Sequence, residues 1–163
     1  LDAISYFNGP KQNIAWCETF VAWCIWKAAN PDQKGTALAA QYQPTRDNCG
    51  CGCKYNAEYY RTKGKFFSTP QEGDVFFVGK RGSETHMGFV LSVNGNGTFT
   101  TIEGNHGDKV ATCTRSVSEC SGFGRPWYTP ESDKPGTPAP TPTTSNADKC
   151  LAEIKEVLKK YGY

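Results

Sequence analysis

The chain has little net charge and no long apolar run, and these two absences exclude several kinds of protein. Its 18 Lys and Arg residues almost balance its 16 Asp and Glu residues, which leaves a formal net charge of +2. Nucleic-acid-binding domains usually carry a basic stripe, so we expect no nucleic-acid partner. Because no apolar stretch is long enough to cross a bilayer, we also expect no membrane span.

An export signal is also missing from the start of the chain. Leu1-Asp2-Ala3 has neither the basic start nor the apolar run of a signal peptide. The first residue is not Met, which is compatible with a processed or excised fragment. The missing signal therefore does not argue against export.

Histidine is scarce whereas cysteine is abundant. The 163 residues include 2 His and 8 Cys. If one cysteine is kept as a free thiol, an odd number remains and they cannot all pair within the chain. Many cysteines in so short a chain are typical of proteins outside the reducing cytosol. The cysteines are Cys17, Cys24, Cys49, Cys51, Cys53, Cys113, Cys120 and Cys150.

Two groups of these cysteines suggest a disulfide or a metal. Cys113 and Cys120 bracket a short polar loop and could bridge each other. Residues 49–53 read CGCGC, which predicts a loop or irregular strand. Its CxC spacing is atypical of structural zinc. We therefore expect disulfides or free thiols here, and neither a metal nor another cofactor.

The first regular element is expected to be a largely buried helix over 16–29. Apolar residues recur there at helical spacing. Pro31 disfavours helix in the residue before it, which ends the run. Shorter helices are expected at 37–42 and 55–61.

From residue 70 the apolar pattern changes to a period of two, which predicts strands. Asn94-Gly95-Asn96-Gly97 is a strong hairpin signal between two of them. A helix followed by consecutive antiparallel strands predicts an α+β fold, with the N-terminal helix packed on a β-meander. The expected strands are 74–78, 85–93, 98–103, 109–113 and 123–128.

The composition changes after Tyr128, which divides the chain into three parts. Residues 1–128 form the expected domain. Residues 129–145 are rich in Pro and Thr and predict an extended linker. Residues 146–163 carry apolar side chains at helical spacing, and this short helix either packs on the domain or begins a second module.

Cys17 is the candidate nucleophile. It lies in the first turn of the expected helix, where unpaired N–H groups and the helix dipole favour an anion. Such a position lowers the pKa of a thiol and favours the reactive thiolate. The alternative is a buried structural cysteine. Cys24 lies two turns further along the same helix without this advantage, and we interpret it as a core residue.

A cysteine nucleophile needs a base, usually a histidine, and His86 is the better candidate. A two- or four-residue loop in the predicted hairpin places His86 opposite Asn105, with Glu103 diagonal on the same face. Either side chain could orient the imidazole. A three-residue loop would instead place His86 opposite His106, the alternative base.

These segments resemble the CHAP domains, cysteine- and histidine-dependent amidohydrolases and peptidases of the papain-like group. The similarity covers AWCETFVAWC at 15–24, GDVFF at 73–77, HMGFV at 86–90 and IEGN at 102–105. It implies a papain-like α+β fold, with Cys17 as nucleophile, His86 as base, and Glu103 and Asn105 as orienting residues. Some CHAP domains bind calcium just before the cysteine, but residues 8–13 here hold no carboxylate.

The resemblance implies a peptidoglycan hydrolase that cleaves an amide bond of the wall peptide, as an endopeptidase or an N-acetylmuramoyl-L-alanine amidase. Such domains occur in phage endolysins and bacterial autolysins, so we expect a monomer acting outside the cell or at the wall, with bacterial peptidoglycan as its partner. Trp16, beside the nucleophile, is a candidate for substrate binding. Two alternatives remain: a secreted effector acting on a protein amide, and a non-catalytic wall-binding module with an inert Cys17.

Overall fold

The computed structural model describes two stretches of the chain and one isolated residue. The predicted helix at 37–42, the linker at 129–145 and nearly all of 146–163 lie outside them. None of the helices that the structure describes is long and apolar enough to cross a membrane. The described residues are 15–29, 52–126 and 156.

Helix α2 (Cys17–Ala29) confirms the predicted N-terminal helix. Its first intrahelical bond runs from the Phe20 N–H to the Trp16 carbonyl, at 2.9 Å, so Trp16 occupies the position before the helix. Glu18 in the first turn and Lys27 in the last complement the helix dipole. Apolar side chains of α2 pack against the sheet beside strand β3 (His86–Val93).

Helix α4 (Cys53–Thr62) is longer than the predicted helix at 55–61. The expectation that Cys53 belongs to a loop is wrong. Gly52 precedes the helix with φ of 114°, a conformation that side chains rarely adopt, and this turn lets the helix begin at Cys53. Cys53, Ala57 and Tyr60 recur at helical spacing and are buried against the core.

Six antiparallel strands form a single sheet, so the α+β class is confirmed. Strands β2 to β5 follow one another as the predicted meander, but β6 returns to pair between β1 and β2. Strand β1 was not expected, and the two last strands are displaced from their predicted bounds. The remaining strands are β1 (Phe66–Phe67), β2 (Val75–Val78), β4 (Thr98–Glu103), β5 (Ala111–Ser116) and β6 (Cys120–Gly124).

A β-bulge sets the register of the β3–β4 hairpin. Near the turn, Val93 pairs with Phe99, whereas further along Phe89 pairs with Ile102. The register shifts between Val90 and Ser92, so Leu91 is the extra residue on β3. The second register is the one that the predicted pairing of His86 with Asn105 requires, but β4 ends at Glu103, before Asn105 is reached.

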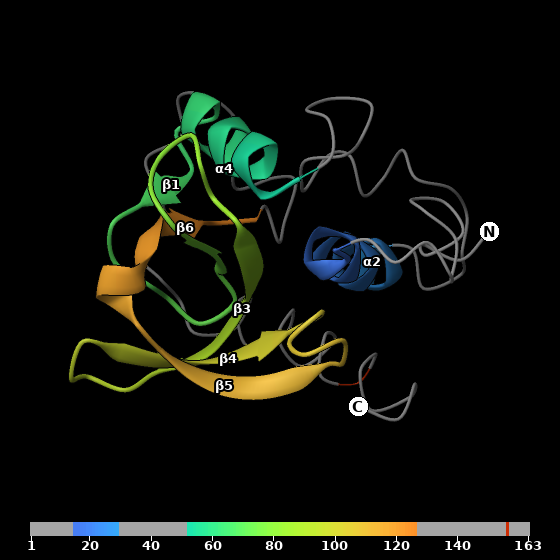
Figure 1. Ribbon diagram of the computed structural model, residues 1–163. Helices are drawn as coiled ribbons and strands as arrows, with labels where there is room; N and C mark the ends of the chain where they lie inside the picture. The colour runs from blue at the N-terminus through green and yellow to red at the C-terminus, as the bar shows by residue number, and fades with distance from the viewer. Residues whose placement is uncertain (1–14, 30–51, 127–155, 157–163) are drawn as a thin grey trace.

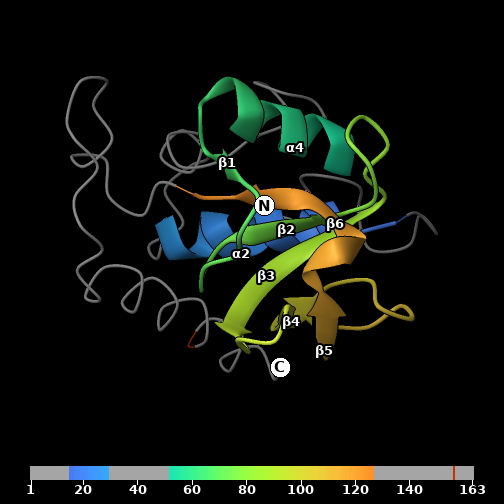
Figure 2. The same cartoon turned by 90° about the vertical axis from the view of Figure 1, so that its left-hand side faces the viewer.

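The sheet curls strongly (Figures 1 and 2). Two clusters of buried apolar side chains pack on it. One cluster lies between the sheet and helices α2 and α4. The other joins Phe76, Phe99 and Phe123 from β2, β4 and β6. Strands β4 and β6 are not neighbours in the sheet, yet the ring centroids of Phe99 and Phe123 are 5.3 Å apart. The sheet therefore closes around this second cluster.

Gly104, directly after β4, lets helix α2 approach the sheet closely. A Cβ atom at this position would overlap the side chain of Phe20, and it would lie 2.8 Å from the Trp16 ring. The end of β4 and the start of α2 are thus in contact through the glycine backbone. This contact holds the first turn of α2 against the end of the strand.

Gly104→Ala is expected to destabilise the protein by about 1–3 kcal/mol, because the added methyl must push Phe20 or the backbone aside. Urea unfolding followed by tryptophan fluorescence measures this change. Thr112→Ala, on an exposed position of β5, is the matched control. Equal unfolding midpoints for the two variants would contradict the close approach.

Candidate active site

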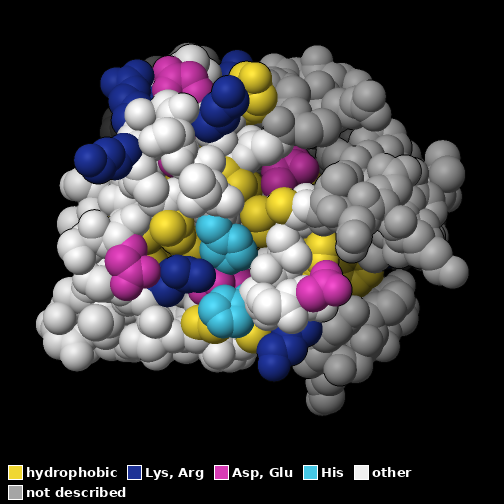
Figure 3. All heavy atoms as spheres, in the orientation of Figure 1, with side chains coloured by type: hydrophobic (Ala, Val, Ile, Leu, Met, Phe, Trp, Pro, Cys, Tyr) yellow, Lys and Arg dark blue, Asp and Glu magenta, His cyan; other side chains and the backbone are white. Residues whose placement is uncertain are grey.

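Three side chains meet where α2, β3 and β4 come together. Cys17 is the first residue of α2, His86 begins β3, and Glu103 ends β4. The Cys17 residue is only 3% exposed, and Glu103 is fully buried. Figure 3 shows both histidines of the chain next to each other on one face, beside hydrophobic side chains.

His86 links the thiol to the carboxylate. Its Nε2 atom lies 2.8 Å from Oε2 of Glu103. The imidazole is also close enough to the Cys17 sulfur that the two groups shift each other's pKa. Of the two predicted orienting residues, Glu103 is the one whose side chain the structure places against the imidazole of His86.

The surroundings of Cys17 favour the thiolate. A hydrogen bond from Cys53 lowers the Cys17 pKa most. Burial of the thiol acts in the opposite direction and raises the pKa. The hydrogen bond and charge of His86 and the hydrogen bond from the Met87 N–H lower the pKa further, to about 4. Burial disfavours the charged form of His86, but its bonds to Cys17 and Glu103 raise its pKa to about 9. Between these values the pair is a thiolate and an imidazolium.

Arg115 on β5 holds Glu103 in place, and the sequence reasoning missed it. Its Nε donates to Oε1 at 2.6 Å and its Nη2 to Oε2 at 2.7 Å. The Thr101 hydroxyl also donates to Oε1, at 2.6 Å. Burial alone would raise the Glu103 pKa, but the bonds from His86 and Arg115 hold it well below its usual range. The carboxylate thus stays charged although it is buried.

His106 reaches the same carboxylate from the loop after β4. Its Nδ1 lies 3.3 Å from Oε2 of Glu103, and its side chain is 47% exposed. Of the two histidines, His86 is the one that contributes to the lowered pKa of Cys17. His86 is therefore the histidine placed to exchange a proton with the thiol.

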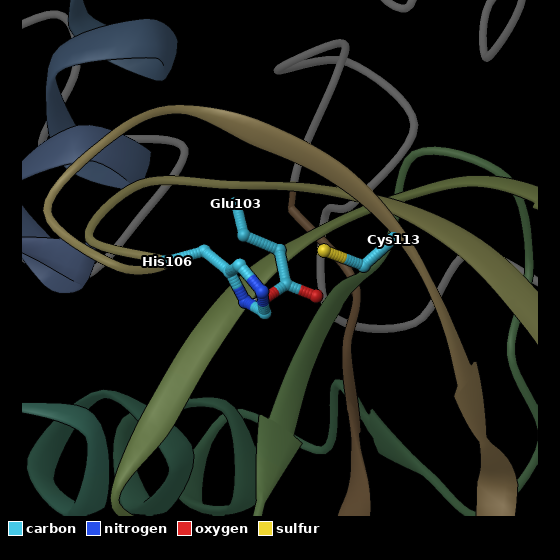
Figure 4. A group of neighbouring side chains, drawn as sticks. All are labelled: Glu103, His106 and Cys113. Atoms are coloured by element: carbon cyan, nitrogen blue, oxygen red, sulfur yellow. The ribbon is translucent and has the colours of Figure 1, made fainter.

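Glu103, His106 and Cys113 converge closely enough to resemble a metal site (Figure 4). Their potential ligand atoms lie within 4.8 Å of one another. However, Arg115 already occupies both oxygens of Glu103. A cation there would have to displace a guanidinium or lie beside its positive charge. The donor set fits an ion-pair network better than a metal. Residues 8–13, considered above for calcium, lie outside the described part of the chain.

Cys53 contacts the Cys17 thiol from the first turn of α4. The two Sγ atoms are 3.7 Å apart and both residues are buried. The hydrogen bond with Cys17, burial and the negative charge of Cys17 all raise the Cys53 pKa, so Cys53 keeps its proton and acts as the donor. No pattern in the sequence predicted this contact, because residues 49–53 were expected to form a loop.

Glu18, next to Cys17 on α2, is a second buried acid near the thiol. It is 7% exposed, and its Oε1 has no hydrogen-bond partner in the structure. Burial raises its pKa to about 7, although a hydrogen bond from Asn56 opposes this shift. A fixed negative charge here would disfavour the thiolate, so partial protonation of Glu18 benefits Cys17.

Trp16 and Asn105 flank the three central residues. The Trp16 Nε1 donates to Oδ1 of Asp108 at 2.9 Å, which ties the start of α2 to the loop between β4 and β5. Asn105 has a left-handed backbone with φ of 61° and lies just after Gly104. Substrate binding by Trp16 and an orienting role for Asn105 stay predictions.

The other described cysteines are not arranged for chemistry. Cys113 and Cys120 are free thiols, so the suggested bridge between them is wrong. Cys120 belongs to β6, which pairs with β2, whereas Cys113 is on β5 at the opposite end of the sheet. Burial raises the pKa of the Cys24 thiol, in agreement with its interpretation as a core residue.

Iodoacetamide is expected to alkylate Cys17 at a pH well below the usual thiol pKa of about 8.5, because only a thiolate reacts. With a pKa of about 4, the Cys17 thiolate is already formed in mildly acidic solution. Peptide mass spectrometry at a series of pH values measures the reaction, and Cys24 is the internal control. Alkylation that begins only near the ordinary thiol pKa would contradict the depressed value.

The chain is similar to a protein family and to a solved structure. A solved structure described as "The crystal structure of Ly7917" is similar, with a TM-score of 0.42 and 18% sequence identity over 64% of this chain and 51% of that one. The chain thus spans about half the length of that protein. No curated protein matches the chain. The pattern of the CHAP domain matches residues 9–105, more than half of the chain. The chain belongs to the CHAP domain family.

Proposed function

We propose that this protein is a cysteine hydrolase that cleaves an amide bond in the peptide part of bacterial peptidoglycan. Membership of the CHAP family indicates a hydrolase of the cell-wall type. The observation that carries the proposal is the grouping of three side chains: Cys17 at the start of α2 interacts electrostatically with His86, and the His86 Nε2 lies 2.8 Å from the Glu103 carboxylate. An endopeptidase and an N-acetylmuramoyl-L-alanine amidase both fit this chemistry.

In the proposed reaction, the Cys17 thiolate attacks the carbonyl carbon of the scissile amide. The backbone N–H groups at the start of α2 are placed to stabilise the negative oxygen of the tetrahedral intermediate. His86 gives its proton to the leaving amine, and a thioester remains. Water, deprotonated by His86, then hydrolyses the thioester and restores the thiolate. Glu103 keeps the imidazole in the correct orientation throughout.

The proposed substrate determines the expected place of action. A wall hydrolase meets peptidoglycan outside the cytoplasm, so we propose an extracellular or wall location and action as a monomer. A non-catalytic wall-binding module is a poorer account, because it gives no reason for the low pKa of Cys17. The effector alternative shares the chemistry and differs in substrate alone.

Purified peptidoglycans of several chemical types provide the test. The protein is incubated with each, and soluble fragments are identified by mass spectrometry. We expect fragments with new amino and carboxyl ends at one kind of amide bond, and these ends distinguish endopeptidase from amidase. If no wall type yields fragments while a protein amide is cleaved, the wall function is wrong and the effector alternative holds.

A further inference from the structure

The contact between Cys17 and Cys53 places a second thiol beside the nucleophile. The sulfur atoms are 3.7 Å apart, inside the interface between α2 and α4. Catalysis by Cys17 and His86 requires no second sulfur, so the reaction does not explain why one lies there. Of the other described cysteines, Cys24 is two turns along α2, and Cys113 and Cys120 lie on β5 and β6.

We propose that Cys53 is a resolving thiol: a peroxide oxidises Cys17, and Cys53 captures the oxidised sulfur as a reversible Cys17–Cys53 disulfide. The disulfide would stop hydrolysis and protect the nucleophile from irreversible oxidation. The disulfide itself depends only on the geometry, whereas its effect on activity rests on the proposed function.

The chemistry is balanced with hydrogen peroxide as the oxidant. The Cys17 thiolate attacks one peroxide oxygen, the O–O bond breaks, and the hydroxide that leaves takes up a proton to become water. Cys17 is then a sulfenic acid. The Cys53 sulfur, after losing its proton, attacks the Cys17 sulfur, the S–O bond breaks and a second water forms. In total, two thiols and one peroxide give one disulfide and two waters.

The electrostatics of the pair suit this order of events. Cys17 carries the negative charge and is therefore the sulfur that a peroxide oxidises first. The Cys53 thiol keeps its proton partly because the Cys17 thiolate is so close. Oxidation of Cys17 to the neutral sulfenic acid removes that charge, and Cys53 can then ionise and attack more easily.

The geometry leaves a short distance to close. A disulfide requires the two sulfurs to approach to about 2.05 Å. Cys17 and Cys53 are each the first residue of their helix, so neither lies in the interior of a rigid helix. Rotation of the two side chains toward each other is the movement required.

The test treats the full chain with hydrogen peroxide and maps cross-linked peptides by mass spectrometry without reduction. We expect a linked peptide pair containing Cys17 and Cys53, which dithiothreitol separates, and a return of most of the starting activity. Cys53→Ser keeps a hydrogen-bond donor but cannot form the bond. In this variant Cys17 should be oxidised further, to sulfinic and sulfonic acid. The fraction of the starting activity that dithiothreitol restores should therefore be at least about tenfold smaller in the variant than in the wild type.

Controls separate this proposal from the hydrolase itself. Cys24→Ala removes another buried thiol of α2 and should behave as the wild type. A link from Cys17 to Cys49 or Cys51, or overoxidation that is the same with and without Cys53, would overturn the proposal. If the Cys17–Cys53 link forms but the reduced protein releases nothing from any wall, the thiol pair stands and the proposed function fails.

Discussion

Replacing Cys17 with Ala is expected to end the release of peptidoglycan fragments, with kcat/KM lowered by roughly 10⁴-fold or more. In the proposed mechanism the Cys17 sulfur forms the covalent bond to the substrate. The neighbouring Cys53 thiol is a poor replacement, because burial raises its pKa and it keeps its proton. The measurement is the mass-spectrometric release assay together with the rate of fragment formation. Circular dichroism and a melting curve establish that the fold is intact.

The matched control for this variant is Cys24→Ala on the same helix. It removes a sulfur that is equally buried but far from His86, so its activity should stay near that of the wild type if the fold survives. A Cys17→Ala protein that still releases fragments at the wild-type rate would rule out cysteine catalysis.

Glu103→Gln is expected to lower kcat/KM by about 10²–10⁴-fold, the range in which loss of an orienting carboxylate falls. The neutral amide cannot stabilise the His86 imidazolium, so the pKa of His86 should fall from about 9. Activity is lost at high pH when His86 loses its proton. The alkaline limb of the pH–rate profile should therefore move to lower pH, which is the signature of a positioning role.

The same variant should also lose stability, by roughly 1–3 kcal/mol, because Arg115 loses its buried anionic partner and keeps only the exposed Glu119. The double variant Glu103→Gln/Arg115→Gln removes both charges and should recover part of the stability but none of the activity. Recovery of activity together with stability would mean that Glu103 acts only through the fold. An unmoved alkaline limb would exclude its effect on His86.

The central part of the site was predictable because period-two patterning and the hairpin signal fixed which ends of β3 and β4 meet. The predicted pairing of His86 with Asn105 agrees with the register of Phe89 and Ile102. Loop length alone would not have predicted this pairing, however, because the pair nearest the turn is Val93 with Phe99, which belongs to the other register. Continued without interruption, that pairing would have placed His86 opposite His106. The bulge at Leu91 restores the register that the predicted pairing requires.

What the sequence could not provide were contacts made by side chains from distant elements. Arg115 lies beyond the predicted strand at 109–113, so nothing connected it with Glu103. Cys53 reaches Cys17 because α4 begins one residue after Gly52, and periodicity does not reveal a helix start that depends on an unusual backbone angle. Pairing of helices against each other is set by the packed core, which single-sequence patterns do not describe.

The place of β6 in the sheet affects how the protein is made. Because β6 lies between β1 and β2, the sheet cannot be completed until the ribosome has added Cys120–Gly124. Before that point Cys17, His86 and Glu103 have already been synthesised, but one edge of the apolar strand β2 is still unpaired. An unpaired strand edge promotes aggregation. The nascent chain therefore contains all three of these residues before β2, the strand that pairs with the His86-bearing β3, has both of its neighbours.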